Sequence, residues 1–194
     1  MDTLNVKVII GSTRPGRFGD KPAAWVAELA KQQVGFEVEV LDVRDYPMPF
    51  FNEPVSLSSS GGKVSYPEAI AWAKKIGEAD AFVIMAPEYN HGYPAVLKNA
   101  LDYAYAEWNN KPVGFVGYGS VGGARSVEQL RLVVAELQMA SVRTSVHIMA
   151  PWTLSDEQGN LSAGALDQYA QSAQSMLEQL GLWGRALKVA REAK

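Results

Sequence analysis

A loop of small and cationic residues follows the first apolar run of the chain. Residues 11–20 read Gly-Ser-Thr-Arg-Pro-Gly-Arg-Phe-Gly-Asp and stand directly before a helical pattern. Small residues let backbone N–H groups approach an anion closely, and the N-terminus of a helix carries partial positive charge. Ser12 adds a hydroxyl donor, and Arg14 and Arg17 add fixed charge. These residue types predict a phosphate-binding loop.

The loop differs from a nucleoside-triphosphate P-loop at two diagnostic positions. Gly11 and Gly16 have the Walker A spacing, but Arg17 and Phe18 stand where that motif has Lys and a Mg²⁺-binding Ser or Thr. We therefore do not expect an NTPase site. An ordinary strand-to-helix turn with two solvated arginines is the alternative interpretation, so the other loops must decide between the two.

A second unusual loop covers residues 87–94. Its sequence, Pro-Glu-Tyr-Asn-His-Gly-Tyr-Pro, combines two prolines and a glycine with three aromatic or imidazole rings. An irregular backbone of this kind leaves N–H and C=O groups free to bind the polar edge of a flat heteroaromatic ligand. We expect the loop to face such a ring. The alternative is a rigid turn whose Tyr89 and Tyr93 only cover the core.

A third loop, residues 117–123, reads Gly-Tyr-Gly-Ser-Val-Gly-Gly and matches the pattern G-x-G-x-x-G. The dinucleotide-binding fingerprint follows the first strand of its unit, and an acidic residue stands about 20 residues later, at the end of the next strand. Here the next apolar run ends Val-His-Ile-Met-Ala-Pro, without a carboxylate. We therefore interpret the loop as a second surface whose glycines let a ligand come close to the backbone, with Ser120 as a hydroxyl donor. The alternative is a plain glycine turn that caps a helix.

The sequence contains no pair of side chains spaced for general acid–base catalysis. It has no cysteine and only two histidines, His91 and His147, which argues against thiolate nucleophiles and a zinc site. Asp42, Asp45 and Glu88 are expected to cap helices or face solvent. We expect no catalytic side chain and no bound metal, so redox chemistry would need a cofactor. His91 could donate a proton beside it, or be a simple surface residue.

Apolar and helical patterns alternate along the chain. Strands are expected at residues 6–10, 36–41, 81–86, 113–117 and 143–148, and helices at residues 21–33, 67–79, 95–105, 123–139 and 161–180. This alternation predicts one doubly wound α/β domain over residues 1–194, with a five-stranded parallel sheet in the order 2-1-3-4-5 between two helical layers. In that order ligands bind beyond the carboxyl ends of strands 1 and 3, where the unusual loops begin.

Composition and charge exclude several kinds of partner. The 194 residues carry a formal net charge of −3, so there is no basic footprint for nucleic acid and no polybasic patch for a membrane surface. No apolar stretch approaches the roughly 18 residues of a membrane span, and residues 1–7 lack the features of a secretory signal. We expect a cytoplasmic protein that binds neither nucleic acid nor membranes.

The three loops together resemble the NADPH-dependent FMN reductase family, which includes quinone, azo-dye and chromate reductases. The matching segments are residues 11–17, 87–94, 98–100 (Lys-Asn-Ala) and 119–123, with Pro-Met-Pro-Phe at residues 47–50. The resemblance implies a flavodoxin-like fold and non-covalently bound FMN. It assigns the phosphate to Ser12, Arg14, Arg17, Phe18 and Gly19, one border of the isoalloxazine ring to Pro87, Glu88, Tyr89, Asn90, His91 and Gly92, and its other edge to Gly119, Ser120 and Gly122.

The same resemblance implies an oxidoreductase with NADPH or NADH as electron donor, which passes hydride through flavin N5 to a quinone, free flavin or similar small acceptor. It also implies a homodimer or homotetramer, for which Tyr103, Tyr105 and Trp108 could supply a surface. A flavodoxin-like electron carrier or flavin-binding module without NAD(P)H turnover is the alternative, but carriers need charge to find partners. A phosphatase of related topology would need a cysteine in the first loop.

Overall fold

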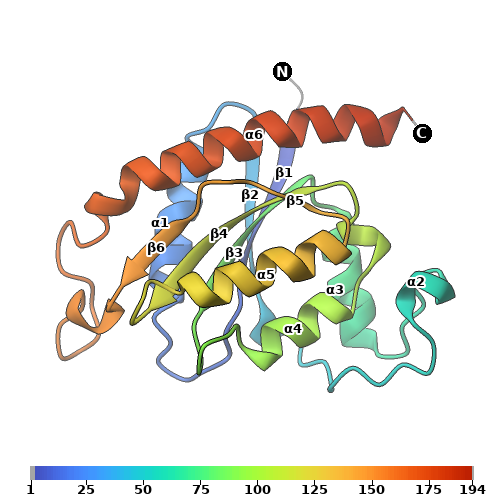
Figure 1. Ribbon diagram of the computed structural model, residues 1–194, viewed down its shortest axis with the longest axis horizontal. Helices are drawn as coiled ribbons and strands as arrows, with labels where there is room; N and C mark the ends of the chain where they lie inside the picture. Colours follow the sequence, from blue (N-terminus) through green and yellow to red (C-terminus); the bar gives the residue numbers. More distant parts are fainter. Residues whose placement is uncertain (1–2, 194) are drawn as a thin grey trace.

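A parallel sheet lies between two layers of helices (Figure 1) in the computed structural model, which describes residues 3–193. The strands are β1 (Leu4–Ile10), β2 (Phe36–Asp42), β3 (Ala81–Pro87), β4 (Pro112–Gly119), β5 (Ala140–Ser141) and β6 (Val146–Met149). Their order is β2-β1-β3-β4, and both β5 and β6 pair in parallel with β4. The predicted order 2-1-3-4-5 is confirmed, with the fifth position shared by two short strands.

The helices divide between the two faces of the sheet. They are α1 (Asp20–Lys31), α2 (Leu57–Ser60), α3 (Pro67–Gly77), α4 (Ala95–Asp102), α5 (Ala124–Glu136) and α6 (Ala170–Glu192), with 3₁₀ helices at Val43–Asp45, Ala106–Trp108, Pro151–Thr153 and Asp167–Tyr169. Alternate side chains of the central strands point to opposite faces of the sheet and belong to two hydrophobic cores. Val8 packs with residues of α1 and α6, and Ile9 packs with residues of α3, α4 and α5. Two buried faces explain why the strands are apolar throughout.

The fifth strand was expected to be continuous over residues 143–148, and this expectation is wrong. Arg131 of α5 donates from its guanidinium to Val142 O at 2.7 Å, to Arg143 O at 2.9 Å and to Ser145 Oγ at 2.9 Å. These contacts hold the segment that follows β5 against α5. The segment therefore leaves the sheet after β5 and rejoins it as β6.

The last helix also differs from the prediction of residues 161–180. α6 begins at Ala170 and continues to Glu192, with buried positions as far as Gly184. The preceding segment is a hairpin in which Ser155 and Leu161 form an isolated β-bridge. Backbone pairing across this hairpin, and a left-handed Gly164 at φ 70°, keep residues 161–169 out of the helix.

The aromatic residues after α4 belong mainly to the core. Tyr103 and Trp108 are fully buried, so the prediction that they supply an oligomer surface is wrong. The Trp108 ring lies 4.7 Å from that of Phe82 between centroids, and the Trp108 indole N–H donates to Leu101 O at 3.1 Å. These contacts fix the end of α4 against β3.

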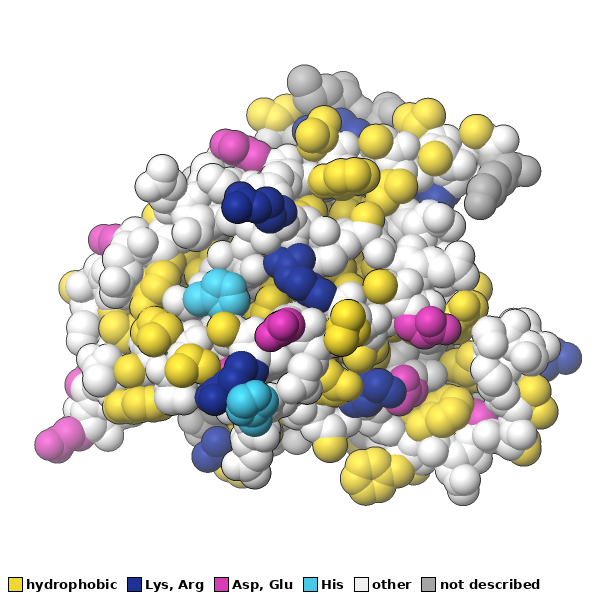
Figure 2. All heavy atoms as spheres, in the orientation of Figure 1, with side chains coloured by type: hydrophobic (Ala, Val, Ile, Leu, Met, Phe, Trp, Pro, Cys, Tyr) yellow, Lys and Arg dark blue, Asp and Glu magenta, His cyan; other side chains and the backbone are white. Residues whose placement is uncertain are grey.

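The face shown in Figure 2 intersperses Lys and Arg side chains with acidic and hydrophobic ones. Within residues 3–193 no helix is long and apolar enough to cross a membrane. The same residues contain no group of three or more His, Cys, Asp or Glu side chains that could hold a metal ion.

Candidate functional site

A cleft of about 560 Å³ opens at the carboxyl ends of β1, β3 and β4. Its volume lies within the usual range for small-molecule sites. It is lined by Arg14, Gly16, Arg17, Phe18, Lys21, Pro87, Glu88, Tyr89, Tyr118, Gly119, Ser120, Pro151, Trp152, Ser155, Asp156 and Gly159. The structure thus brings the three predicted loops together and adds a fourth, the loop that follows β6.

The loop between β1 and α1 offers free backbone donors. Within the described part of the chain, the N–H groups of Thr13, Phe18 and Gly19 have no backbone acceptor. Phe18 and Gly19 immediately precede α1 and so share the positive end of its dipole. Arg14 is exposed, with its guanidinium 5.5 Å from the centre of the Tyr89 ring. This end of the cleft is suited to an anion.

Ser12 connects the first loop to the second. It is fully buried, and its Oγ lies 2.6 Å from the Tyr89 hydroxyl and accepts a hydrogen bond from Arg14 N at 3.3 Å. Neither contact needs a ligand. The Ser12 side chain therefore holds Tyr89 and the start of the loop in register, and it lies behind the surface of the cleft.

The Arg17 side chain forms its hydrogen bonds with other residues of the same chain. The side chain is only 2% exposed, and its guanidinium donates to Asp20 Oδ1 at 2.7 Å, to Asp42 Oδ1 at 2.8 Å and to Ser12 O. Burial lowers the pKa of Arg17, but the hydrogen bonds to Asp42 and Asp20 outweigh it and hold that pKa above its ordinary value. The charge of Arg17 is thus balanced inside the protein, which leaves Arg14 and Lys21 as the other cations lining the cleft.

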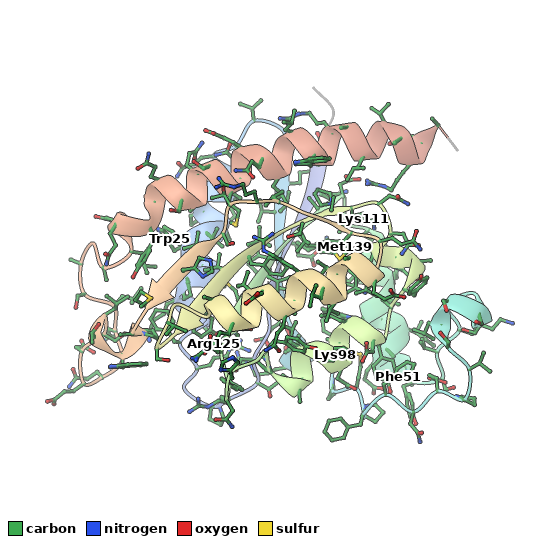
Figure 3. All side chains as sticks on the ribbon, in the orientation of Figure 1. Trp25, Phe51, Lys98, Lys111, Arg125 and Met139 are labelled. Atoms are coloured by element: carbon green, nitrogen blue, oxygen red, sulfur yellow. The ribbon has the colours of Figure 1, made fainter. Side chains whose placement is uncertain are left out.

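An ion pair with a buried carboxylate joins the second loop to the first turn of α5, beside the third loop. Glu88 was expected to cap a helix or face solvent. Its side chain is 4% exposed, so it does not face solvent, but it accepts from Arg125 N in the first turn of α5 at 3.2 Å and from Arg125 Nε at 2.6 Å, which caps that helix. Arg125 lies in the first turn of α5, beside the third loop (Figure 3). Glu88 N also donates to Tyr118 O at 3.0 Å. Pro87 and Glu88 are therefore held at the edge of the sheet, next to Gly119.

Asn90 and His91 form the tip of the second loop, beyond the Glu88–Arg125 ion pair. Tyr89 and Gly92 exchange two backbone hydrogen bonds, of 2.9 and 3.2 Å, around Asn90 and His91. Both central residues have positive φ, 49° and 75°, as in a type I′ turn. Asn90 and His91 are exposed, and Gln129 Nε2 donates to His91 O at 2.7 Å. Neither residue, nor Gly92, lines the cleft, so their contact with a ring stays a prediction.

The third loop lies tightly against the sheet because of its glycines. Gly123 has φ +67°, and a Cβ there would lie 2.5 Å from Tyr118 N and 2.9 Å from Ala86 O. Gly119 O accepts from Ala150 N at 2.9 Å, which connects this loop to the end of β6. Gly119 and Ser120 line the cleft. Gly122 is buried behind it, with His147 Nδ1 3.0 Å from its carbonyl oxygen.

Sequence reasoning missed the fourth wall of the cleft, residues 151–159. Pro151 and the exposed Trp152 begin it, and Asp156 closes its hairpin by accepting from Asn160 N at 2.8 Å. Gly159 reaches Lys21, whose Nζ would lie 3.8 Å from a Cβ at that position. The available signal was positional, because a loop after the fifth strand must leave the same edge of the sheet as the other three.

Two hydroxyl groups on the lining fit a ligand with several acceptor atoms. Tyr118 Oη and Ser155 Oγ are buried and have no hydrogen-bond partner within the described residues. Unpaired buried hydroxyls are costly and are usually satisfied by water or a ligand. Together with the free N–H groups of Phe18 and Gly19, they match a phosphorylated ligand with polar groups along its length, as FMN is.

A smaller cavity of about 250 Å³ lies on the other side of the first loop. It is lined by Thr13, Val43, Arg44, Tyr46, Pro47, Met48, Val96 and Asn99. Asn99 of α4 shapes it, since its Nδ2 donates to Pro49 O and its Oδ1 accepts from Phe51 N, both at 2.8 Å. The segment at residues 47–50 is thereby fixed beside the loop after β1.

Comparison with known proteins agrees with this geometry. Residues 4–153 match the family model for NADPH-dependent FMN reductases. An NAD(P)H-dependent FMN reductase of Schizosaccharomyces pombe is 41% identical over 150 residues, which are 77% of this chain and 74% of that protein. One from Pseudomonas aeruginosa is 30% identical over 196 residues, covering 96% and 98% of the two chains.

Solved structures show the same fold at lower identity. The flavoenzyme NAD(P)H:(acceptor) oxidoreductase FerB from Paracoccus denitrificans superposes with a TM-score of 0.71 at 20% identity, covering 92% of this chain and 98% of that chain. A flavodoxin, WrbA-like protein from Agrobacterium tumefaciens gives 0.53 at 19% identity, covering 99% and 100%. The flavodoxin-like fold is therefore confirmed, and the chain belongs to the NADPH-dependent FMN reductase family.

Proposed function

We propose that the cleft binds FMN non-covalently and that the protein uses NAD(P)H to reduce a quinone, free flavin or similar small acceptor. The observation that carries the proposal is the meeting of free N–H donors, Arg14 and two backbone-rich loops in one cleft of about 560 Å³. When bound, FMN would supply the electron-transfer chemistry. The family assignment makes the protein an oxidoreductase.

The residues of the chain bind and orient in this proposal. Arg14 and the N–H groups of Phe18 and Gly19 hold the phosphate, and Pro87–Tyr89 with Gly119 and Ser120 border the ring. The Glu88–Arg125 ion pair and the Ser12–Tyr89 contact keep the bordering loops rigid before any ligand enters. Such preorganisation lowers the cost of ordering the site on binding. No acid–base pair is required of the side chains.

The relatives favour turnover over electron carriage. They include a 2-hydroxy-1,4-benzoquinone reductase of Burkholderia and an NADPH:quinone oxidoreductase of Arabidopsis thaliana. The electron-carrier alternative is therefore not favoured. A planar acceptor such as a quinone suits a cleft bordered by Tyr89 and the exposed Trp152, because aromatic rings offer flat apolar surfaces.

An anaerobic absorption titration tests cofactor and donor together. The purified protein is expected to take up FMN and to lose the flavin absorption band on addition of NADPH or NADH. Addition of 1,4-benzoquinone should restore the band. Failure to take up FMN would contradict the proposal, and FMN that binds but is not bleached by either donor would reinstate the carrier alternative. The two initial bleaching rates give the donor preference.

We further propose a homodimer or homotetramer in the cytoplasm. Phe50, which is 80% exposed, and Trp152, which is 65% exposed, are large apolar side chains available for subunit contact. A cytoplasmic location suits dependence on NAD(P)H. Multi-angle light scattering tests the first point, and a monomeric mass at micromolar concentration would contradict it. Cell fractionation tests the second, with recovery in the membrane or external fraction as the contrary result.

A further inference from the structure

Tyr118 places a buried hydroxyl on the lining of the cleft without giving it a partner. The residue lies at the carboxyl end of β4 and is 6% exposed. Its Oη has no hydrogen-bond partner among residues 3–193. A buried hydroxyl in this state costs free energy, and that cost is recovered when a ligand supplies an acceptor. An acceptor atom of a bound ligand would therefore satisfy the Tyr118 hydroxyl.

The position of the hydroxyl identifies the part of the ligand. A Cβ on residue 19 would overlap the Tyr118 hydroxyl, so glycine at this position lets the phenol lie against the N-terminus of α1. The ring of Tyr118 also lies 5.5 Å from that of Phe18 between centroids. Phe18 and Gly19 carry two of the free N–H groups of the first loop. The hydroxyl thus joins the donors that would surround a phosphate.

The electrostatics of this position favour an acceptor with negative charge. Burial raises the pKa of Tyr118, and the neighbouring Tyr89 and Asp20 raise it further, while Arg17 and Arg14 lower it by less. The phenol is therefore protonated at neutral pH and donates. A protonated hydroxyl beside two N–H groups and Arg14 suits a phosphate oxygen better than a neutral hydroxyl group, because hydrogen bonds to charged acceptors are the stronger ones.

We propose that the Tyr118 hydroxyl donates a hydrogen bond to the phosphate monoester of FMN, and that this contact helps the protein to distinguish FMN from riboflavin. The inference rests on the proposed FMN site. It adds to that site a hydrogen-bond donor from β4, because the Tyr118 side chain reaches Gly19 in the loop after β1. The phosphate would then be bound from two strands of the sheet, which explains why an apolar strand ends in a tyrosine with an unpaired hydroxyl.

The test compares two flavins in one variant. Tyr118→Phe keeps the ring and removes only the hydroxyl, so FMN should bind about tenfold more weakly or worse, as for loss of a hydrogen bond to a charged group. Riboflavin affinity should not change, and the thermal midpoint of the flavin-free protein should not fall. Tyr105→Phe is the matched control, since its hydroxyl lies outside the cleft and accepts from Gln138 Nε2 at 3.2 Å.

Unchanged FMN affinity, or an equal loss for both flavins, would overturn the inference. Wild-type protein that binds no FMN would instead contradict the proposed function, so the two failures are distinguishable. If Tyr118→Phe does not fold, wild-type protein labelled at tyrosine Cζ gives the answer by NMR. The Tyr118 resonance should shift with FMN, and with inorganic phosphate alone, but not with riboflavin; a shift that is the same with both flavins and absent with phosphate would overturn the inference.

Discussion

Arg17 and Asp42 join the loop after β1 to the carboxyl end of β2. Arg17 Nη1 donates to Asp42 Oδ1 at 2.8 Å, and the same carboxylate accepts from Arg44 N at 2.9 Å. The guanidinium is almost completely withdrawn from solvent, so solvent and salt screen the pair little. The pair holds the backbone of the loop after β1 in place, and its arginine is not free to balance the charge of a ligand.

Asp42→Asn should destabilise the fold by about 3 kcal/mol, because breaking a buried ion pair leaves an uncompensated charge. Among residues 3–193, only Asp20, which is half exposed, would remain as a carboxylate partner of Arg17. Urea unfolding at neutral pH measures the loss. Asp45→Asn, at an exposed position in the adjacent 3₁₀ helix, is the control and should cost little. Equal losses would show that the Arg17–Asp42 contact contributes nothing specific.

The same pair predicts a dependence on acid. Burial would raise the pKa of Asp42, but hydrogen bonds from Arg17 and Arg44 outweigh it and hold the pKa well below its ordinary value. A carboxylate of this kind contributes stability above its unfolded pKa, near 3.9, and loses it as the pH falls toward the folded pKa. The difference between wild type and Asp42→Asn should therefore be constant from about pH 5 to 7 and shrink below about pH 4.

Arg14→Ala should weaken FMN binding by about 1.5 to 3 kcal/mol, the range for a hydrogen bond to a charged group. Its guanidinium is exposed and stacks near Tyr89, so its removal should leave the unfolding midpoint almost unchanged. Flavin fluorescence titration measures the affinity. Arg143→Ala is the control, because Arg143 is exposed and does not line the cleft. Unaltered affinity would mean that Arg14 is only solvated.

The sheet and the place of the site were predictable because they follow from local pattern and topology. Apolar runs joined by helical crossovers leave few arrangements, and the order found is the common one. Since carboxyl ends of parallel strands share one edge, loops after strands 1, 3 and 4 had to meet. Their composition then indicated a phosphate and a ring.

The features that sequence reasoning missed depend on partners distant along the chain. Whether Arg17 is solvated, bound to phosphate or paired is decided by Asp42, 25 residues away. The break in the fifth strand is decided by Arg131, a side chain of α5 that binds Val142 and Arg143 carbonyls. Residue types do not encode such pairings. The ion pair of Glu88 was missed for the same reason, because its partner Arg125 lies 37 residues further on.

Gly123→Ala should destabilise the protein by more than about 2 kcal/mol, since left-handed backbone costs an L-residue roughly 1–2 kcal/mol and the new Cβ would also meet backbone atoms. Those atoms are Tyr118 N at 2.5 Å and Ala86 O at 2.9 Å. Gly61→Ala is the matched control, because Gly61 has nearly the same φ, +68°, with nothing within 4 Å of a Cβ. Chemical unfolding measures the free-energy loss in each variant. The loss in Gly61→Ala reports backbone strain alone, and the additional loss in Gly123→Ala reports the steric overlap of the new Cβ. Similar losses in both variants would mean that the third loop is not tightly packed.

Lys111 is buried at the end of the sheet opposite Arg125 (Figure 3) and should make stability rise with pH. It is 6% exposed, and its Nζ donates to Ile76 O at 2.9 Å and Gly77 O at 3.0 Å. Burial lowers the pKa of Lys111 to about 8, with Arg191 adding to the effect.

The direction of the pH effect follows from the two states. Between about pH 8 and 10.4 the unfolded chain keeps the Lys111 proton while the folded protein releases it, so stability increases over this range by up to about 3 kcal/mol. Below pH 8 both states are charged, and the folded state carries the cost of burial. Lys111→Met should remove this increase, and Lys63→Met, at an exposed position, should retain it. Urea unfolding at pH 7 and pH 10 measures the change, and parallel pH profiles for wild type and Lys111→Met would contradict the assignment.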